Sequence, residues 1–336
     1  MRRNAEILFC SAKLNMRNND TVKIEIADKL KPPQIELIPK PHLPVSSEKY
    51  EYFPWPYYLS LPFMWLITSY VMLKKNLYRV LGLGQPKTNT FLFDGLGKES
   101  RKVKDYATTW RAMNIVYHHP FPQTWTPGGM IDEFYWFGLN CQALRNRLKL
   151  VKDELRKAIS KVDNGSEIRI LSLACGSAES VIEIMAEAKA MHKRIKAIFV
   201  DIDGDALEWA KTTARHYGLD GQITTYKGHI YDAIESSYEF KPQIVEMMGF
   251  LDYIEQKDAI YWVSKIREII EPDGFLITCN ISPNIEQHFL KWVINWPMVY
   301  RSPKDLDDVA RTAGFTDFRL IYEPLKIHGL LVARKS

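Results

Sequence analysis

The second half of the chain alternates between short apolar runs and longer segments whose apolar residues recur at three- and four-residue spacing. Such alternation indicates βα units, because buried parallel strands are apolar throughout and the helices that cover them are amphipathic. The predicted strands cover residues 168–173, 195–200, 222–226, 243–247 and 275–278, and predicted helices cover 206–217, 259–270 and 303–313. Two last runs, 318–322 and 329–333, are typical of a hairpin. Together these elements predict a doubly wound α/β fold around a mainly parallel sheet.

The connection after the first predicted strand consists of small residues. They are Ala174, Cys175, Gly176, Ser177 and Ala178. Small residues allow a tight turn, from which backbone N–H groups and the start of the next helix can face a ligand. The second predicted strand ends at Asp201, where a carboxylate can accept both hydroxyls of a ribose. This arrangement predicts an adenosine site, and the missing Gly-x-Gly-x-x-Gly pattern disfavours a pyrophosphate.

These features resemble the cofactor site of the class I, Rossmann-like methyltransferases that use S-adenosylmethionine (SAM). The first motif of that family reads as an acidic residue followed by Gly-x-Gly-x-Gly, and the corresponding residues here are Ser172, Ala174, Gly176 and Ala178. Residues 272–274 match the family's Pro-x-Gly turn before an apolar strand. The resemblance covers roughly residues 166–336. It implies a seven-stranded sheet, SAM as the cofactor and methyl transfer as the activity.

The resemblance also implies which residues surround the cofactor. Residues 248–254 match the loop that covers the reactive sulfonium, and residues 228–230 match the adenine edge, where His229 stands in place of the usual acid. The residues expected to bind SAM are Ser172, Ala174, Cys175, Gly176, Ser177, Asp201, Ile202, His229, Ile230, Met248, Gly249 and Arg145.

Residues 51–160 are predicted to form a helical cap on the cofactor domain, which spans 161–336. Apolar residues recur at helical spacing over 103–116 and 132–159, with a proline- and glycine-containing break between them. The second helix leads directly to the first strand, so four of its polar residues are candidates for contact with the SAM carboxylate. They are Asn140, Gln142, Arg145 and Arg147, and a guanidinium suits a carboxylate well. A solvated face on a packing helix explains these residues equally well.

Residues 57–73 carry no charged side chain and are followed by Lys74, Lys75 and Arg79. The run is shorter than the roughly 20 apolar residues of a membrane span, and Pro62 interrupts it. A helix over 63–77 is therefore expected either to pack in the core or to lie partly in one membrane leaflet. Residues 1–50 read as an extended or poorly ordered leader without a signal peptide. We expect a cytoplasmic protein whose contact with a membrane, if it has one, is peripheral.

Composition and charge narrow the function classes. Four cysteines without a Cys-x-x-Cys pair or nearby histidine clusters predict neither a disulfide framework nor a metal site. Residues 51–160 carry 15 basic and 8 acidic side chains, whereas residues 161–336 carry 21 and 26. The basic segment suits anionic lipid, nucleic acid or an acidic substrate, or simply a solvated surface. The acidic cofactor half, together with the lack of an Asn/Asp-Pro-Pro-aromatic motif after the fourth strand, disfavours nucleic acid.

The sequence therefore favours transfer of the SAM methyl group to a small-molecule or lipid-like acceptor. Such a reaction needs alignment, exclusion of water and, where the nucleophile carries a proton, a base. Candidates for the base, or for positioning the acceptor, are His118, His119, Asp252, Tyr253 and Tyr300. Three alternatives stay open: transfer of an aminopropyl or aminocarboxypropyl group, a nicotinamide-dependent dehydrogenase, and a non-catalytic membrane or protein-binding module with a degenerate SAM site.

Overall fold

A single mainly parallel sheet forms the centre of the C-terminal half. The computed structural model describes residues 49–52, 56–118, 125–162, 165–237 and 239–336, so the expected leader lies almost wholly outside them. Within these ranges, seven strands are ordered β3-β2-β1-β4-β5-β7-β6. Their bounds are Ile168–Leu173 (β1), Ile195–Asp201 (β2), Ile223–Lys227 (β3), Ile244–Met247 (β4), Phe275–Ile281 (β5), Asp317–Tyr322 (β6) and His328–Arg334 (β7). The expected doubly wound fold is confirmed.

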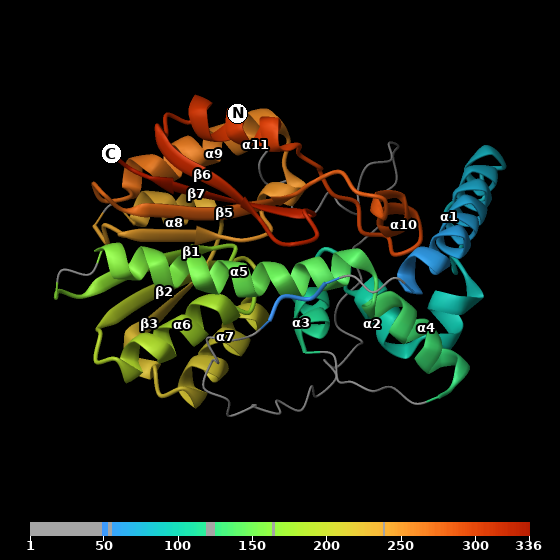
Figure 1. The fold of residues 1–336 in the computed structure, drawn as a ribbon, viewed down its shortest axis with the longest axis horizontal. Coiled ribbons are helices and arrows are strands. Elements are labelled where there is room, and N and C mark those ends of the chain that lie inside the picture. Colours follow the sequence, from blue (N-terminus) through green and yellow to red (C-terminus); the bar gives the residue numbers. More distant parts are fainter. Residues whose placement is uncertain (1–48, 53–55, 119–124, 163–164, 238) are drawn as a thin grey trace.

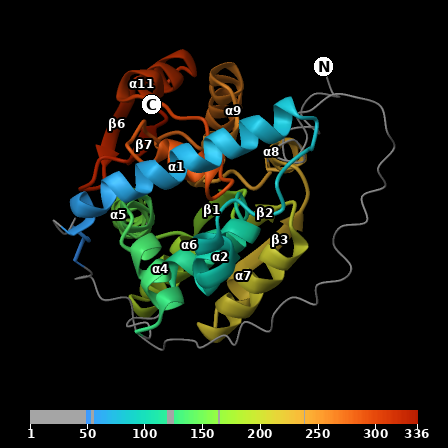
Figure 2. The ribbon, with the colours of Figure 1, turned by 90° about the vertical axis from the view of Figure 1, so that its right-hand side faces the viewer.

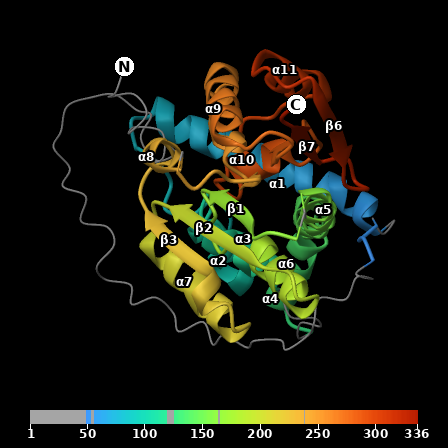
Figure 3. The same ribbon diagram turned by 90° about the vertical axis from the view of Figure 1, so that its left-hand side faces the viewer.

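Helices cover both faces of the sheet (Figures 1 and 3). One face packs against α5 (Leu139–Val162), α6 (Glu179–Ala190) and α7 (Gly204–His216), through residues such as Leu155, Val181 and Ala210. The other face packs against α8 (Ile230–Ser236), α9 (Gln256–Ile269) and α11 (Pro303–Thr312). Short 3₁₀ turns at Asp220–Gln222 and Leu251–Tyr253 complete the connections. The central strands are thus buried on both sides, which explains their continuous apolar sequence.

A cap of helices lies beyond the carboxyl ends of the parallel strands, on the right in Figure 1. It contains α1 (Pro56–Val80), a π-helical turn (Leu92–Leu96), α2 (Lys98–Asp105), α3 (Trp110–Tyr117), α4 (Pro127–Trp136) and the N-terminal part of α5. A separate apolar core, which includes Phe93 and Trp136, holds these elements together. Helix α10 (Gln287–Trp292) belongs to the later half of the chain but packs in this same core through Phe289.

Two of the predicted cap helices are each broken into two. The helix expected over 103–116 is interrupted between α2 and α3, where Thr108 has a φ of 70° and Thr109 Oγ1 donates to the carbonyl oxygen of Tyr106 at 2.7 Å. Threonine hydroxyls compete in this way with helical hydrogen bonds. The helix expected over 132–159 is interrupted at Gly138, and Glu286 accepts the N–H groups of the residues that follow, Leu139 and Asn140, both at 2.8 Å. A carboxylate from α10's N-terminal flank thereby caps α5.

The antiparallel strand β7 places its first residue at the edge where the parallel strands end. Its register pairs His328 with Ile281, the last residue of β5. Because β7 runs against its neighbours, its N-terminal end meets their carboxyl ends, where ligands bind in open α/β sheets.

Candidate active site

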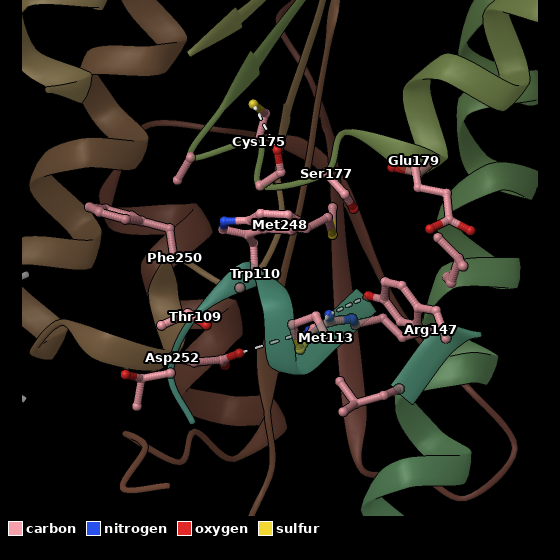
Figure 4. Close-up of a pocket in the computed structure, with 18 of the residues that line it drawn as sticks. Thr109, Trp110, Met113, Arg147, Cys175, Ser177, Glu179, Met248, Phe250 and Asp252 are labelled. Carbon is pink, nitrogen blue, oxygen red and sulfur yellow. Dashed lines mark hydrogen bonds and ion pairs between the residues drawn. The ribbon is translucent and has the colours of Figure 1, made fainter. Parts of the chain in front are cut away.

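A cavity of about 310 Å³ lies between the carboxyl edge of the sheet and the cap. Its cofactor-facing wall comes from the turn after β1, the end of β2 and the loop after β4: residues 174–180, 201–203, Glu246 and 248–250. Its other wall comes from the cap and the last strands, and includes Thr109, Trp110, Met113, Tyr117, Arg147, Asp252, Tyr253, Trp296, Met298 and His328. Figure 4 shows Trp110, Met113 and Arg147 lying opposite Cys175 and Ser177.

The turn after β1 takes a conformation that favours glycine at three alternate residues. Ala174, Gly176 and Ala178 have φ values of 49°, 53° and 51°. A left-handed conformation costs an alanine about 1–2 kcal/mol, so the two alanines hold the strained backbone of the Gly-x-Gly-x-Gly motif. Gly176 has a further constraint, because a Cβ there would lie 3.1 Å from Cβ of Trp110. The sequence therefore departs from the motif while its backbone keeps the shape.

Asp201 is held in place at the end of β2 by backbone groups. Its Oδ2 accepts the N–H of Gly176 at 2.8 Å, and its Oδ1 accepts the N–H of Asp203 at 2.9 Å. Burial raises the pKa of this carboxyl, and the two backbone hydrogen bonds oppose that rise. Each carboxylate oxygen keeps a second lone-pair direction, so the group can also accept hydroxyls from a ligand.

Glu246 brings a buried carboxylate beside Ser172, the residue at the motif's acidic position. The two residues pair across β1 and β4, and Ser172 Oγ donates to Glu246 Oε2. Ser180, on α6, donates to Oε1 at 3.4 Å. Burial raises the pKa of Glu246 to about 7, against the opposing effect of both serines and of Arg147. An acid missing from β1 is thus present on the adjacent strand.

The cap is anchored to the cofactor-facing wall by α3. Trp110 Nε1 donates to Asp203 Oδ2 at 2.8 Å, and its ring packs against Trp209 with 5.6 Å between ring centroids. Arg111 forms ion pairs with Asp203 and Asp205. These contacts place the indole of Trp110 over the Gly176 turn, and they close the cavity on that side.

A second charged group lies at the cap side of the cavity. Arg147 on α5 is 2% exposed, donates to Tyr117 Oη at 2.9 Å, and has its Nη1 4.0 Å from Asp252 Oδ2. Asp252 Oδ1 accepts the N–H of Ile281 at 2.8 Å. Burial raises the pKa of Asp252 to about 6, and nearby Arg147 offsets only part of that rise.

His328 contributes an imidazole to the same wall. The residue is 1% exposed, and neither ring nitrogen has a hydrogen-bond partner among the described residues. Burial lowers the pKa of His328 well below its ordinary value, and the charge of Arg147 lowers it further. A buried imidazole without a partner is rare in folded proteins, because each unpaired nitrogen costs the desolvation free energy of a polar group.

Several residues that the sequence proposed do line the cavity. They are Ala174, Cys175, Gly176, Ser177, Asp201, Ile202, Met248, Gly249, Asp252 and Tyr253, the last of which accepts Trp296 Nε1 at 2.8 Å. Asn140 and Arg147, two of the four polar residues proposed on the cap helix, also line it.

Other proposed residues do not reach the cavity. Arg145 does not line the cavity and pairs with Glu51 at 2.6 Å. It lies two residues before Arg147 on α5, and two residues along an α-helix turn a side chain to the opposite face. Ser172 is buried behind Glu246, and Tyr300 packs beside Leu325 and Ala143. His229 is exposed at the start of α8, and neither it nor Ile230 is among the lining residues.

His118 is exposed at the end of α3 and does not line the cavity, and His119 falls outside the described residues. His118 Nε2 is 3.1 Å from Oε1 of Glu179, which itself lines the cavity. Although burial lowers the pKa of His118, the hydrogen bond to Glu179 and its charge raise it above the ordinary value. This contact joins the end of α3 to the first turn of α6.

Sequence reasoning did not find Glu246, Trp110 or His328. Glu246 has one signal in the sequence, a single acidic residue inside the apolar run of the fourth strand, and His328 similarly precedes the apolar run of the last strand. Buried polar residues in otherwise apolar strands are the informative exceptions to the hydrophobic pattern.

One family of proteins, described as "Putative methyltransferase", matches residues 107–335 of the chain. The chain belongs to this family. It is a SAM-dependent methyltransferase, and its matched region includes every residue that lines the cavity. The strained turn, the anchored Asp201 and the buried Glu246 offer the donors and acceptors that SAM requires, so the residues present fit the cofactor.

One solved structure supports the fold of this methyltransferase, and a second is similar to part of the chain. A protein from Bordetella parapertussis, described as a possible exported protein, has a TM-score of 0.61 at 16% identity, covering 83% of this chain and 96% of that one. Magnesium protoporphyrin IX methyltransferase from Synechocystis PCC 6803, with bound S-adenosylhomocysteine (SAH), has a TM-score of 0.49 at 14% identity, covering 71% and 100%. No curated protein matches the chain in sequence.

Two further findings concern metals and membranes. Within the described ranges, no group of three or more His, Cys, Asp or Glu side chains is arranged to hold a metal ion. None of the helices in the same ranges combines the length and the hydropathy that crossing a bilayer demands.

Proposed function

We propose that this methyltransferase acts on a small-molecule or lipid-like acceptor held at the cap side of the cavity, with His328 accepting a proton from the acceptor. The observation that carries this proposal is the buried imidazole of His328, which lines the cavity without a hydrogen-bond partner in the described chain. An unpaired polar group of this kind is stabilised when a ligand supplies the missing hydrogen bond.

The cofactor-facing wall suits each part of SAM. The carboxylate of Asp201 is positioned to accept the ribose hydroxyls. The first turn of α6, which begins after Ala178 without a side-chain cap, leaves N–H groups for the carboxylate of the methionine moiety. Ile202 and Met248 supply apolar surface from neighbouring loops of the same wall.

Glu246 is the proposed partner of the SAM ammonium group. Ser172 cannot supply the negative charge that this position has elsewhere in the class I family, and Glu246 lies directly beside it on β4. Among the described residues, the hydrogen bonds of Glu246 come from the hydroxyls of Ser172 and Ser180. A buried carboxylate is stabilised by an ammonium group that enters its site, because the charge-assisted hydrogen bond replaces lost hydration.

The cap side suits an acceptor with an apolar body and one ionisable group. Met113, Trp296 and Met298 supply apolar surface, whereas Arg147 and His328 supply a cation and a neutral base. A cavity of about 310 Å³ lies at the lower end of the range for small-ligand sites. Such a site favours a small acceptor, or one part of a lipid, over a folded macromolecule.

The chemistry then depends chiefly on alignment and on removal of the acceptor's proton. SAM, when bound, supplies an electrophilic methyl group on a sulfonium. Trp110 and the cap exclude water from the cavity, and Arg147 orients the acceptor through its charge. The unshared pair of a His328 nitrogen takes the proton of a hydroxyl or amine as that nucleophile forms its bond to the methyl carbon. The carbon–sulfur bond of bound SAM would break in the same step, and SAH would remain.

The test is a transfer assay with the full chain and SAM carrying a tritiated methyl group. A panel of phenols, carboxylic acids, amines and acyl lipids, with a protein sample and a nucleic acid sample beside them, serves as acceptors, and the products are identified by mass. We expect a product heavier by one methylene unit, together with SAH. An added aminopropyl or aminocarboxypropyl group would overturn methyl transfer, and reaction only with proteins or nucleic acids would overturn the acceptor class.

His328→Asn tests the proposed base against a matched control. We expect at least a roughly 100-fold lower transfer rate at an unchanged SAH affinity, because general-base catalysis contributes about that much. The control is His288→Asn, since His288 is exposed on α10 and is not among the lining residues. Equal rates in the two variants would remove His328 from the mechanism.

A further inference from the structure

The outward face of α1 is apolar over most of its length. Ten large hydrophobic residues of this helix are at least 39% exposed: Tyr58, Leu59, Phe63, Trp65, Leu66, Tyr70, Met72, Leu73, Leu77 and Val80. Leu59, Leu66 and Leu73, at seven-residue spacing, are each at least 70% exposed. Proteins that stay monomeric in water rarely expose a continuous apolar surface of this extent.

A narrow stripe fixes the helix to the rest of the cap. Met64, Ile67 and Val71 are buried, at the spacing of one helical face, and they pack in the cap core. Lys75 Nζ adds hydrogen bonds to the Trp292 carbonyl oxygen at 2.7 Å and to Asn295 Oδ1 at 2.6 Å. Figures 1 and 2 show α1 lying across the outside of the cap, on the side away from the sheet. The exposed residues therefore face outward from a rigidly seated helix.

The charges next to this face have one sign. From residue 52 to residue 93 the sequence contains Lys74, Lys75, Arg79 and Lys87 and no acidic residue. Trp65 and Tyr70 add aromatic side chains of the kind enriched at membrane interfaces. A contact between two copies through the same face would be isologous and would offer these cations no acidic partner. Anionic lipid headgroups would offer one.

We propose that α1 lies in the interface of an anionic lipid bilayer, with its outward face among the acyl chains and Lys74 and Arg79 among the headgroups. The stripe that packs on the cap keeps the helix parallel to the membrane surface instead of across it. This proposal stands independently of the methyl acceptor, since it concerns only the outer surface of the cap.

The first experiment is flotation of the full chain with vesicles of phosphatidylcholine mixed with phosphatidylglycerol, and with vesicles of phosphatidylcholine alone. We expect flotation with the mixed vesicles that weakens as salt is added. Leu66→Ser combined with Leu73→Ser should weaken this binding at least tenfold, because a loss of that size corresponds to roughly one large apolar side chain that no longer enters the acyl chains. Lys74→Gln combined with Arg79→Gln should weaken it about 25-fold for mixed vesicles, at about fivefold per charge, and little for neutral ones.

The control pair is Met191→Ser with Tyr261→Ser, which removes two exposed hydrophobic residues of the cofactor domain. All variants change surface residues, and thermal unfolding verifies that each one folds. Failure of the unmodified chain to bind either vesicle would overturn the proposal, and so would an equal loss of binding in the control pair. A mass twice that of one chain in light scattering, lost in the leucine variant and accompanied by no vesicle binding, would assign the face to a second copy instead.

Discussion

Replacing Glu246 by Gln should make the ligand-free protein more stable, and increasingly so as the pH rises. Burial raises the pKa of this carboxyl to about 7 from an ordinary 4.5. The pKa of Glu246 is higher in the folded state than in the unfolded chain. Its protonated form therefore contributes stability that is fully present below about pH 4.5 and is lost as the pH rises through about 7. The difference between these two pKa values corresponds to a loss of about 3 kcal/mol of unfolding free energy at pH values above 7.

Glutamine keeps a neutral group of nearly the same shape at every pH. The two serines donate to different oxygens of Glu246, so the glutamine carbonyl oxygen can accept one hydroxyl and the amide NH2 can donate to the other. The two proteins should therefore unfold at similar denaturant concentrations near pH 4.5, whereas the variant should gain up to about 3 kcal/mol near pH 8. Asp252, whose pKa is also raised, to about 6, affects both proteins equally and cancels in the difference. Urea unfolding across this pH range, with the exposed Glu235→Gln as control, measures the effect.

The cofactor should reverse the order of the two proteins. An ammonium group beside the ionised Glu246 is a charge-assisted partner, so we expect SAH to bind Glu246→Gln at least tenfold more weakly near pH 8 by calorimetry. A variant that is no more stable than the unmodified chain at high pH would refute the burial argument. A gain in stability without any loss of SAH affinity would refute only the role of Glu246 in binding the cofactor.

Three other substitutions test the cofactor-facing wall. Asp201→Ala should weaken SAH binding at least tenfold in calorimetry, because the ribose loses its charged acceptor; a change within about twofold would mean that the cofactor lies elsewhere. Gly176→Ala should destabilise the fold by at least about 1–2 kcal/mol in urea unfolding, since its φ is 53° and its Cβ would crowd Trp110. Ala178→Gly should have the opposite sign, a gain of up to about 1 kcal/mol at a φ of 51°, and a loss of stability would contradict the assigned strain.

The sheet and its cofactor loops could be predicted from the sequence because their pattern is local. Each parallel strand is an apolar run, and the ligand-facing residues, such as Asp201 and Gly176, follow directly at its end. The ranges predicted for β1 and α11 match the structure to within one residue. For the ends of β1 and β2 this local pattern was sufficient, whereas His229 and Ile230 after β3 do not line the cavity.

The cap side of the site depends on long-range contacts, and there the sequence was insufficient. Arg145 and Arg147 look equivalent in the sequence, but helix rotation places the first against Glu51 and the second in the cavity. Glu246 is next to Ser172 only because β4 pairs with β1, at a separation of 74 residues. The break at Gly138 depends on a carboxylate that arrives from Glu286. None of these neighbours is visible to periodicity or to a local motif.

The two walls of the cavity come from different stretches of the polypeptide. The residues that face the cofactor fall between 174 and 250, whereas the other wall is built from residues 108–151 before them and 252–328 after them. Genetic change in the outer stretches can therefore alter which molecule is methylated while the central stretch is inherited unchanged. Homologues of this chain should then diverge in the outer stretches when they differ in acceptor, and chimeras that exchange only these stretches should exchange acceptor preference.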